Sequence, residues 1–460
     1  MLWPTIIWLA SFVLFVLRIN SYPLLNWDEA WYGEIIKNMA SGKYGYLVPF
    51  WNGQYYFDKP PLYFWLTTPL VKLFGIGEWQ ERTVAVISAA FAVLLVYLIA
   101  KILFNRKTAI LSALIFISLG QVWFRLSSGD LDSLQLVVFY SSIYFFLLAQ
   151  KKSKFIYLSG LFLGLSFLVK SWLLGLFPFG FIVFYSVFIS KTSRILLAKM
   201  VASALLISGW WYILGTLKFG NEFVGWYLFS PGAGKYFAFS NYLDIYYLII
   251  VFFDIGLWLV PLFSLFVFRK IRNKFLDSQL TFLFFSLLFI IGLQFSHDKF
   301  DWYLLPIYPI FSFILASLFS RINFRKNKLF LALIVFAFVG QFFITFYKLT
   351  HNPDLSLASA QLGNFASAKL PPQSNIYLDD NDFPAFIYYS NFNRTMVVSP
   401  FGGKVHEPWI ISYASLSTVK KPFWVVSKNW RQLNLGFPSE ILQAPHSYQL
   451  VKFDTQTIKP

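Results

Sequence analysis

Two short stretches near the N-terminus concentrate side chains that can bind or activate a substrate. Residues 26–34 have the sequence Asn-Trp-Asp-Glu-Ala-Trp-Tyr-Gly-Glu, and residues 55–63 have the sequence Tyr-Tyr-Phe-Asp-Lys-Pro-Pro-Leu-Tyr. Asp28 and Glu29 directly follow an apolar run, at a depth where a carboxylate needs a partner or a water-filled cavity. Such a carboxylate can accept a proton from a hydroxyl or an amine. A structural alternative is that Asp28 caps a helix over residues 29–39.

Lys59 is the main candidate for binding an anion. It precedes Pro60 and Pro61, and proline suits the first turn of a helix because its missing N–H would be unpaired there anyway. This order predicts an ammonium close to a helix N-terminus, where the unpaired N–H groups and the helix dipole also attract an anion such as phosphate. The alternative is a lysine whose ammonium only reaches out to the membrane interface.

Further charged side chains fall at the ends of apolar runs that are far apart in sequence. They are Arg125, Asp130, Asp132, Lys170, His297, Lys299 and Asp301. Each of them alone is typical of a solvated loop. When all these ends face the same side of a membrane, the side chains surround one outward-facing cavity, and this is the arrangement we expect.

The composition shows which elements must position these residues. The chain is 57% hydrophobic and only 13% charged, whereas soluble domains carry roughly 25% charged residues. Apolar runs of about 17–24 residues, long enough to cross a hydrocarbon core, recur from residue 3 to residue 347. We predict about eleven helical spans. They cover residues 4–20, 82–103, 108–124, 131–149, 155–170, 172–190, 198–217, 245–268, 278–294, 303–320 and 329–347.

The basic residues agree with this threading. Clusters at 106–107, 151–154, 191–194, 269–274 and 321–328 each follow an even-numbered span, so all of them lie on one face, which the positive-inside rule makes cytoplasmic. The net charge of +17 is therefore a topology signal rather than a sign of nucleic-acid binding. The first run lacks a basic n-region, so we expect a retained span and a cytoplasmic N-terminus. The chain contains no cysteine, which excludes disulfides and thiolate chemistry.

We predict two domains. Residues 1–349 form the membrane domain, whose first outer loop, 21–81, includes a helix over 62–74 that is too short to span and lies in the interface. Residues 350–460 lose the apolar character and form a small extracytoplasmic α/β domain. Its expected strands are 375–378, 395–399, 423–427 and 448–453, and its expected helices are 355–369 and 384–390.

Four groups of residues resemble the protein O-mannosyltransferase and aminoarabinose-transferase superfamily. They are Asp28-Glu29-Ala30, the run 56–63, Leu131-Asp132-Ser133-Leu134 and the run 299–306. Members of this superfamily are glycosyltransferases with the GT-C fold, an all-α polytopic membrane fold. The resemblance covers about residues 1–320. It implies the inverting transfer of one sugar from a polyprenyl-phosphate carrier to an extracytoplasmic glycan, lipid or protein.

The resemblance also implies roles for individual residues. Asp28, with Glu29 beside it, matches the acidic residue that acts on the acceptor nucleophile. Lys59 matches a lysine that contacts the donor phosphate. Further candidates for that phosphate are Lys170, Lys235 and Lys299, and the expected supporting residues are Tyr56, Arg125, Asp132 and His297.

A metal ion is not required by the sequence. Asp58 matches a position where some relatives have a glutamate that binds a metal, together with a histidine from the loop after span seven. Here that loop, residues 218–244, contains no histidine, which leaves His297 as the substitute to consider. Lys59 and Lys299 can stabilise the leaving phosphate without a metal.

Two other classes of protein are compatible with the sequence. One is a transporter or flippase, which also holds polar groups among apolar spans, although usually at the midplane and with an internal repeat. The other is a relative that has lost catalysis. For the enzyme, the expected partners are the lipid-linked donor, the acceptor and membrane lipids, in a bacterial or archaeal plasma membrane. The sequence does not determine the sugar, the acceptor or the oligomeric state.

Overall fold

The computed structural model describes most of the chain, and every structural statement below concerns the described residues. These are residues 2–26, 28–51, 54–229, 245–267, 277–296, 299–350, 355–371, 374–378, 384–390, 396–399, 410–412, 416, 422–428, 438–445 and 448–454.

The chain forms two compact units. The first, here called the helical unit, comprises Met1–Ile19, Phe57–Trp65 and Arg82–Asn352. The second, here called the mixed unit, comprises Asn20–Tyr56, Leu66–Glu81 and Pro353–Pro460. Most of the first predicted outer loop therefore packs with the tail of the chain. The domain boundary at residue 349, drawn from composition alone, stays a prediction.

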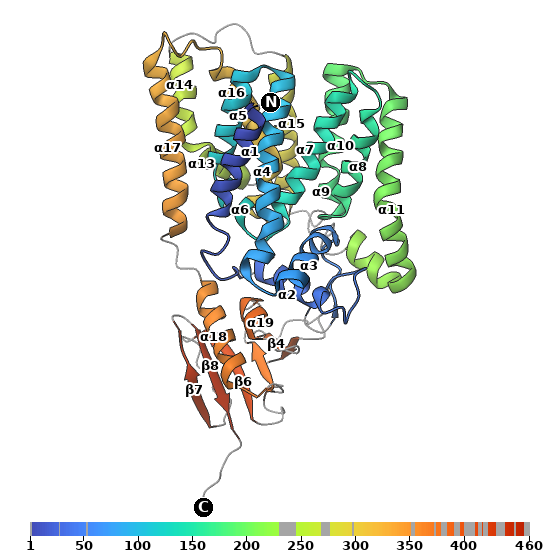
Figure 1. Cartoon of the computed structure of the whole chain (residues 1–460), viewed down its shortest axis with the longest axis vertical. Coiled ribbons are helices and arrows are strands. Elements are labelled where there is room, and N and C mark those ends of the chain that lie inside the picture. Colours follow the sequence, from blue (N-terminus) through green and yellow to red (C-terminus); the bar gives the residue numbers. More distant parts are fainter. Residues whose placement is uncertain are drawn as a thin grey trace, which may run out of the picture. The chain divides into compact units, whose positions relative to one another are not determined.

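The helical unit consists of helices throughout its described part (Figure 1). They are α1 (Leu2–Val16), α4 (Glu78–Leu103), α5 (Arg106–Ser118), α6 (Val122–Ser127), α7 (Asp132–Ala149), α8 (Phe155–Phe167), α9 (Trp172–Gly175), α10 (Phe177–Tyr185), η1 (Ser186–Ser190), α11 (Arg194–Val224), η2 (Gly225–Phe229), α13 (Tyr246–Ile255), η3 (Gly256–Trp258), α14 (Leu259–Val267), α15 (Asp277–Gln294), η4 (Asp301–Ile307), α16 (Tyr308–Phe319) and α17 (Lys328–Thr350).

Seven helical segments in the described part of the chain are long and apolar enough to cross a membrane. They are Glu78–Leu103, Asp132–Ala149, Trp172–Ser190, Arg194–Tyr227, Tyr246–Leu265, Asp301–Phe319 and Lys328–Tyr347. The other four expected spans fall on α1, α5 with α6, α8 and α15, which are shorter or less uniformly apolar. The prediction of a polytopic α-helical membrane protein is confirmed, and the count of eleven spans stays a prediction.

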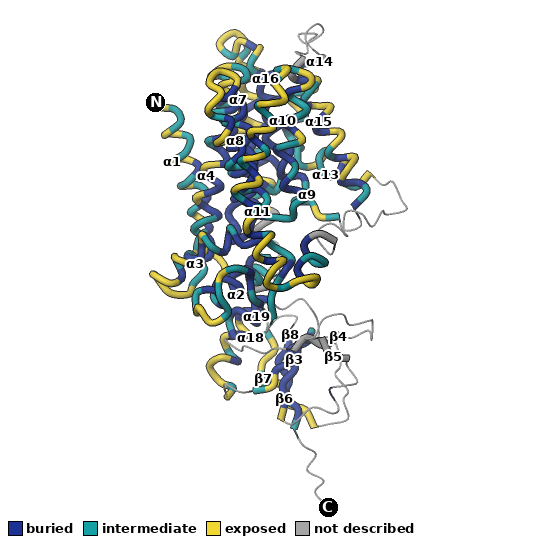
Figure 2. Tube along the Cα trace, turned by 90° about the vertical axis from the view of Figure 1, so that its right-hand side faces the viewer, coloured by how far each residue is buried: buried dark blue, intermediate teal, exposed yellow. Residues whose placement is uncertain are grey.

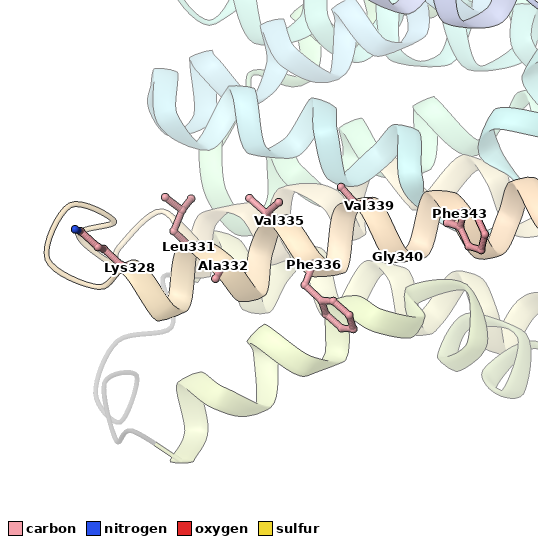
Figure 3. Close-up of a pocket in the computed structure, with 8 residues that line it drawn as sticks. All are labelled: Lys328, Leu331, Ala332, Val335, Phe336, Val339, Gly340 and Phe343. Atoms are coloured by element: carbon pink, nitrogen blue, oxygen red, sulfur yellow. The ribbon is translucent and has the colours of Figure 1, made fainter.

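Burial separates inner from outer helices in the helical unit. The most apolar windows of Asp132–Ala149 and Asp301–Phe319 are 78% and 83% buried, whereas that of Lys328–Tyr347 is only 22% buried. The exposed side of α17 is a shallow apolar depression that includes Val335, Phe336 and Phe343, and Phe336 points towards α14 (Figure 3). A surface of this kind suits contact with lipid.

Glycines allow two of these helices to approach closely. A Cβ atom at Gly160 of α8 would lie 2.4 Å from the Met200 carbonyl oxygen of α11, and one at Gly164 would lie 2.7 Å from the Ala204 carbonyl oxygen. The four-residue spacing puts both glycines on one face of α8, which is the small-residue pattern that packs membrane helices together.

The mixed unit combines helices with a six-stranded sheet. Its helices are α2 (Asp28–Ala40), most of α3 (Leu62–Phe74), α18 (Leu355–Lys369) and α19 (Pro384–Ser390), and a short hairpin pairs β1 (Phe50–Trp51) with β2 (Gln54–Tyr55). The sheet order is β5-β4-β3-β6-β8-β7. The strands are β3 (Ile376–Leu378), β4 (Met396–Ser399), β5 (Ile410–Ser412), β6 (Phe423–Lys428), β7 (Ser439–Gln443) and β8 (Tyr448–Phe453).

Strands β5, β4, β3 and β6 run parallel, while β8 and β7 are antiparallel additions. The four predicted strands and both predicted tail helices are confirmed, as is the helix over 62–74. Strands β5 and β7 were not predicted from the sequence. Inner strands β6 and β8 are buried along nearly their whole length, but β7 is an exposed edge strand with few apolar residues to mark it (Figure 2).

Candidate active site

An ion network centred on Asp132 lies within the helical unit. Asp132 is the first residue of α7, Arg125 lies on α6, and Lys170 follows α8. The Lys170 ammonium is 2.6 Å from Oδ1 of Asp132, and the Arg125 guanidinium is 3.2 Å from Oδ2. Because the Asp132 side chain is only 3% exposed, both of its oxygens need the cationic partners that they have.

A second carboxylate and two aromatic rings complete this network. Asp130 lies 3.6 Å from Arg125, and its Oδ1 accepts a hydrogen bond of 2.9 Å from the backbone N–H of Asp132. The Arg125 guanidinium lies 4.1 Å from the centre of the Trp302 ring, and the Lys170 ammonium lies 6.0 Å from that of Tyr303. Cations over aromatic faces are held electrostatically, so the motif at 299–306 supports the network.

Lys59 and Asp58 form an ion pair in the same unit. Each of the two side chains is 19% exposed, so the pair is accessible. The hydroxyl of Tyr227 donates a hydrogen bond of 2.6 Å to the Lys59 carbonyl oxygen. At the start of α3, the Leu62 N–H donates to the Leu168 carbonyl oxygen over 2.9 Å. This bond ties the segment of Lys59 to the segment of Lys170.

The backbone near Lys59 differs in detail from the expected proline-led first turn. Helix α3 begins at Leu62, and the carbonyl oxygen of Pro61 accepts the first helical hydrogen bond, from the Trp65 N–H, over 2.8 Å. Both prolines therefore precede the helix, and Lys59 lies in a bend just before its N-terminus.

Lys299 and Asp301 also belong to the helical unit. Lys299 is half-buried, and Asp301 opens the 3-10 helix η4. The Asp301 carboxylate accepts hydrogen bonds from the Gln121 amide, over 2.8 Å, and from the Tyr246 hydroxyl. The carboxylate thus anchors the turn that carries Lys299.

Asp28, Glu29 and Tyr56 belong to the mixed unit. Asp28 is the first residue of α2 and is half-buried, and it accepts a hydrogen bond of 3.3 Å from the Tyr32 hydroxyl. Glu29 is buried and accepts a hydrogen bond of 2.7 Å from the Leu25 N–H, which closes the turn before the helix. The Tyr56 ring lies 5.8 Å from that of Trp31. Since Asp28 and Lys59 are in different units, their expected common chamber stays a prediction.

Two further candidates, Lys235 and His297, lie outside the described residues. Within the described ranges, no three histidine, cysteine, aspartate or glutamate side chains gather closely enough to hold a metal. Asp58 occupies the position of a metal ligand in some relatives. Here it is paired with the Lys59 ammonium, which would compete with a metal ion for the same carboxylate oxygen. The described donors do not fit a metal, and no step of the chemistry is assigned to one.

Buried polar groups beside the ion network escaped the sequence analysis. Four side-chain atoms have no hydrogen-bond partner among the described residues: Ser133 Oγ, Gln135 Nε2, Ser171 Oγ and Trp172 Nε1. Ser133 and Gln135 share the first turn of α7 with Asp132, and the other two directly follow Lys170. Buried polar groups normally have partners, so these atoms are suited to a polar ligand. Serine and glutamine in an apolar run carry no signal of such a role.

Sequence comparison connects this geometry to known proteins. A profile of the family described as dolichyl-phosphate-mannose-protein mannosyltransferase matches residues 58–214. An uncharacterised protein of Aquifex aeolicus is 28% identical over 68% of this chain and 72% of its own. An undecaprenyl phosphate-alpha-4-amino-4-deoxy-L-arabinose arabinosyl transferase of Yersinia enterocolitica is 31% identical, over 35% of this chain and 30% of its own length.

Solved structures show the same fold. ArnT from Cupriavidus metallidurans bound to undecaprenyl phosphate has a TM-score of 0.78 with 16% sequence identity, over 98% of each chain. The oligosaccharyltransferase AglB from Archaeoglobus fulgidus, in complex with an inhibitory peptide and a dolichol-phosphate, has a TM-score of 0.55 with 14% identity, over 100% of this chain and 75% of its own. The chain is an integral membrane protein with the GT-C fold, and its residues 58–214 are similar to the protein mannosyltransferase family.

Proposed function

We propose that this glycosyltransferase moves one sugar from a polyprenyl-phosphate carrier to an acceptor outside the cytoplasm, with inversion at the anomeric carbon. The observation that carries the proposal is the grouping of cations in the helical unit. Lys59 and Lys170 are on segments joined by the hydrogen bond between Leu62 and Leu168. Lys170 also forms an ion pair with Asp132, which is paired in turn with Arg125. The related ArnT and AglB structures contain undecaprenyl phosphate and dolichol-phosphate, respectively.

The reaction needs one base and one source of positive charge. The acceptor oxygen or nitrogen forms a bond to the anomeric carbon while the bond from that carbon to the phosphate oxygen breaks. The electron pair of the broken bond leaves with the polyprenyl phosphate, and the acceptor proton passes to the Asp28 carboxylate. Lys59 stabilises the charge that the phosphate gains. A single displacement of this kind inverts the configuration, unlike a mechanism with a covalent glycosyl intermediate.

The polar groups beside Asp132 provide a place for the sugar of the donor. A sugar presents several hydroxyl groups, each able to donate and accept hydrogen bonds. Ser133 Oγ and Gln135 Nε2 are buried without partners among the described residues, so a bound sugar would satisfy them. The related proteins name mannose and 4-amino-4-deoxy-L-arabinose, and both sugars belong in the first panel of donors.

The test is release of the lipid product. Purified protein in lipid nanodiscs is incubated with a radiolabelled undecaprenyl-phosphate sugar and a membrane extract as acceptor, and free undecaprenyl phosphate is measured. We expect release by the native chain and none by Asp28→Asn, with unchanged folding. Asp454→Asn, an exposed carboxylate of the tail, is the matched control and should keep full activity. Release by Asp28→Asn at the native rate would remove Asp28 as the base.

Lys59→Ala tests the phosphate contact separately. We expect weaker binding of undecaprenyl phosphate, because the ammonium supplies charge at the leaving group. Undiminished affinity would rule out that contact. Transport of the lipid-linked sugar without release of undecaprenyl phosphate would instead identify a transporter or flippase.

A further inference from the structure

Lys37 links the helix that begins at Asp28 to the tail of the chain. It lies near the end of α2, and its side chain is 15% exposed. Its ammonium is 3.0 Å from Oε2 of Glu34 and donates a second hydrogen bond, also of 3.0 Å, to the carbonyl oxygen of Tyr388 on α19. The same ammonium lies 5.5 Å from the centre of the Tyr388 ring. One charged group thus joins two helices that are far apart in sequence.

The other end of α2 is fixed by the same two tail helices. Asn26, just before α2, accepts a hydrogen bond of 3.1 Å from the Ala385 N–H of α19 and donates one of 3.3 Å to Ser359 of α18. The Tyr389 hydroxyl accepts a hydrogen bond of 2.9 Å from the Leu24 N–H and donates one of 2.6 Å to Glu78. Asp28 therefore lies between two attachments, one on each side of it in sequence.

Apolar packing makes the contact between α2 and α19 close. A Cβ atom at Gly33 would lie 2.7 Å from a Leu24 methyl carbon and 3.0 Å from the Tyr388 ring. Leu24, Ala30 and Ala385 are fully buried in the same cluster. A larger residue at position 33 would have to displace the Leu24 side chain and press on the Tyr388 ring, so α2 packs closely against α19 here.

We propose that Lys37 is a positioning residue for Asp28: by clamping α2 to α19, it holds the carboxylate at the start of this helix in its working position. The inference rests on the proposed role of Asp28 as the base. Asn26 holds the chain just before α2 and Lys37 holds the other end of the helix, so without Lys37 this stiff helix can pivot about the Asn26 attachment, which reorients the Asp28 side chain. A base must stay within hydrogen-bond reach of the proton that it removes, and small displacements of a reacting group lower the rate steeply.

The surroundings explain why this clamp is a lysine. The groups that interact with Lys37 are Glu34 from α2, Glu81 from the start of α4, and Tyr388 from α19. Glu29 and Glu78 in turn interact with Glu81, and both Glu34 and Glu81 are buried. Without Lys37, Glu34 would lose the cation that stabilises its charged form.

Kinetics of three variants test the proposal. Lys37→Met should lower kcat for release of undecaprenyl phosphate by roughly 10- to 100-fold and leave KM for the donor unchanged, because the base is displaced but the phosphate contact is not. Lys37→Arg, which keeps the charge and the donors, should restore most of the activity. Lys43→Met removes an exposed lysine shortly after the same helix and should match the native chain.

A measurement independent of activity separates this inference from the proposed function. Hydrogen–deuterium exchange of peptides covering residues 24–40 should be faster in Lys37→Met than in the native chain, and unchanged in Lys43→Met. If Lys37→Met does not fold, Glu34→Gln combined with Lys37→Met removes both charges and is measured instead. Native kcat, or native exchange over α2, in the Lys37→Met chain would overturn the inference. Failure of the native chain to release undecaprenyl phosphate would overturn the enzymatic assignment and the role of Asp28, whereas the exchange measurement would still decide whether Lys37 clamps α2 to α19.

Discussion

Both oxygens of the Asp132 carboxylate are paired with cations. One oxygen forms an ion pair with Lys170 and the other with Arg125. The Asp132 side chain is 3% exposed, and those of Lys170 and Arg125 are each 12% exposed. In so dry a setting, a charge without its partner is costly, whereas the pair itself is worth little compared with apolar packing. The network should therefore be sensitive to loss of one member.

Asp132→Asn should destabilise the helical unit by roughly 3–5 kcal/mol, because it leaves two cations without their shared carboxylate. Thermal unfolding in detergent, followed by circular dichroism, measures the effect. The control is Asp454→Asn, which breaks an exposed pair with Lys452 and should change the unfolding free energy by less than about 1 kcal/mol. Equal midpoints for the two variants would contradict a structural role for the network.

Glu34 makes the stability of the folded chain depend on pH. Burial raises the pKa of Glu34 above its ordinary value, and the Lys37 ammonium opposes this shift only in part. The folded chain therefore holds this proton more tightly than the unfolded chain does. Its contribution to stability is present below the ordinary glutamate pKa, about 4.3, and is lost as the pH rises through the raised pKa.

Glu34→Gln should remove this contribution and flatten the pH dependence of the unfolding midpoint, above about pH 4.3. Denaturation of the native chain and the variant across pH 4 to 8 provides the comparison. Glu440→Gln, an exposed glutamate of the same unit, should leave the slope as it is. A native slope in Glu34→Gln would show that another group is responsible.

At the scale of elements, contacts between helices depend on the absence of side chains at a few positions. Gly160 and Gly164 bring the backbone of α8 against that of α11, and Gly33 of α2 leaves room for the Leu24 side chain and the Tyr388 ring. In the first case the obstacle is a carbonyl oxygen, which cannot rotate away as a flexible side chain can. These close approaches decide which helices are neighbours.

Gly160→Ala should destabilise the helical unit by about 1–3 kcal/mol, because the added methyl group would lie 2.4 Å from the Met200 carbonyl oxygen. Gly209→Ala, on α11 with nothing within 4 Å of the added group, should be neutral or stabilising by up to about 1 kcal/mol. Chemical denaturation in detergent of both variants tests the difference. A stable Gly160→Ala chain would show that α8 and α11 can separate without loss.

At the scale of the whole molecule, the basic clusters predict the orientation in the membrane. The first outer loop and the segment at Lys299 should face the exterior, with the clusters at 151–154 and 269–274 inside. The proposed function requires this orientation, because groups on opposite faces of the membrane cannot bind the same donor phosphate.

The absence of cysteine from the chain makes this testable without background. Single cysteines at Lys43 and Lys299 should react with a membrane-impermeant maleimide added to intact cells, and a cysteine at Lys152 should react only after permeabilisation. Labelling of positions 43 and 299 from opposite sides would contradict both the topology and the enzymatic assignment.

The sequence by itself determined the parts that depend on local patterns. Apolar runs of membrane-spanning length predict helices wherever they occur, and period-two or continuous apolar runs predict the inner strands β6 and β8. The helices over 62–74, 355–369 and 384–390 are confirmed for the same reason. Charged residues at the ends of apolar runs are conspicuous because hydrocarbon tolerates them only with partners, which singled out Arg125, Asp132 and Lys170.

Only the tertiary structure decided which of these residues meet. The pairing of Asp132 with Lys170 depends on the close packing of α7 and α8, and the clamp of Lys37 on Tyr388 depends on a contact between segments more than 300 residues apart. In the sequence, Lys37 looks like any lysine on the polar side of a helix. Its proposed role depends on the contact with Tyr388 of α19, which forms only when the chain folds and which no local sequence pattern predicts.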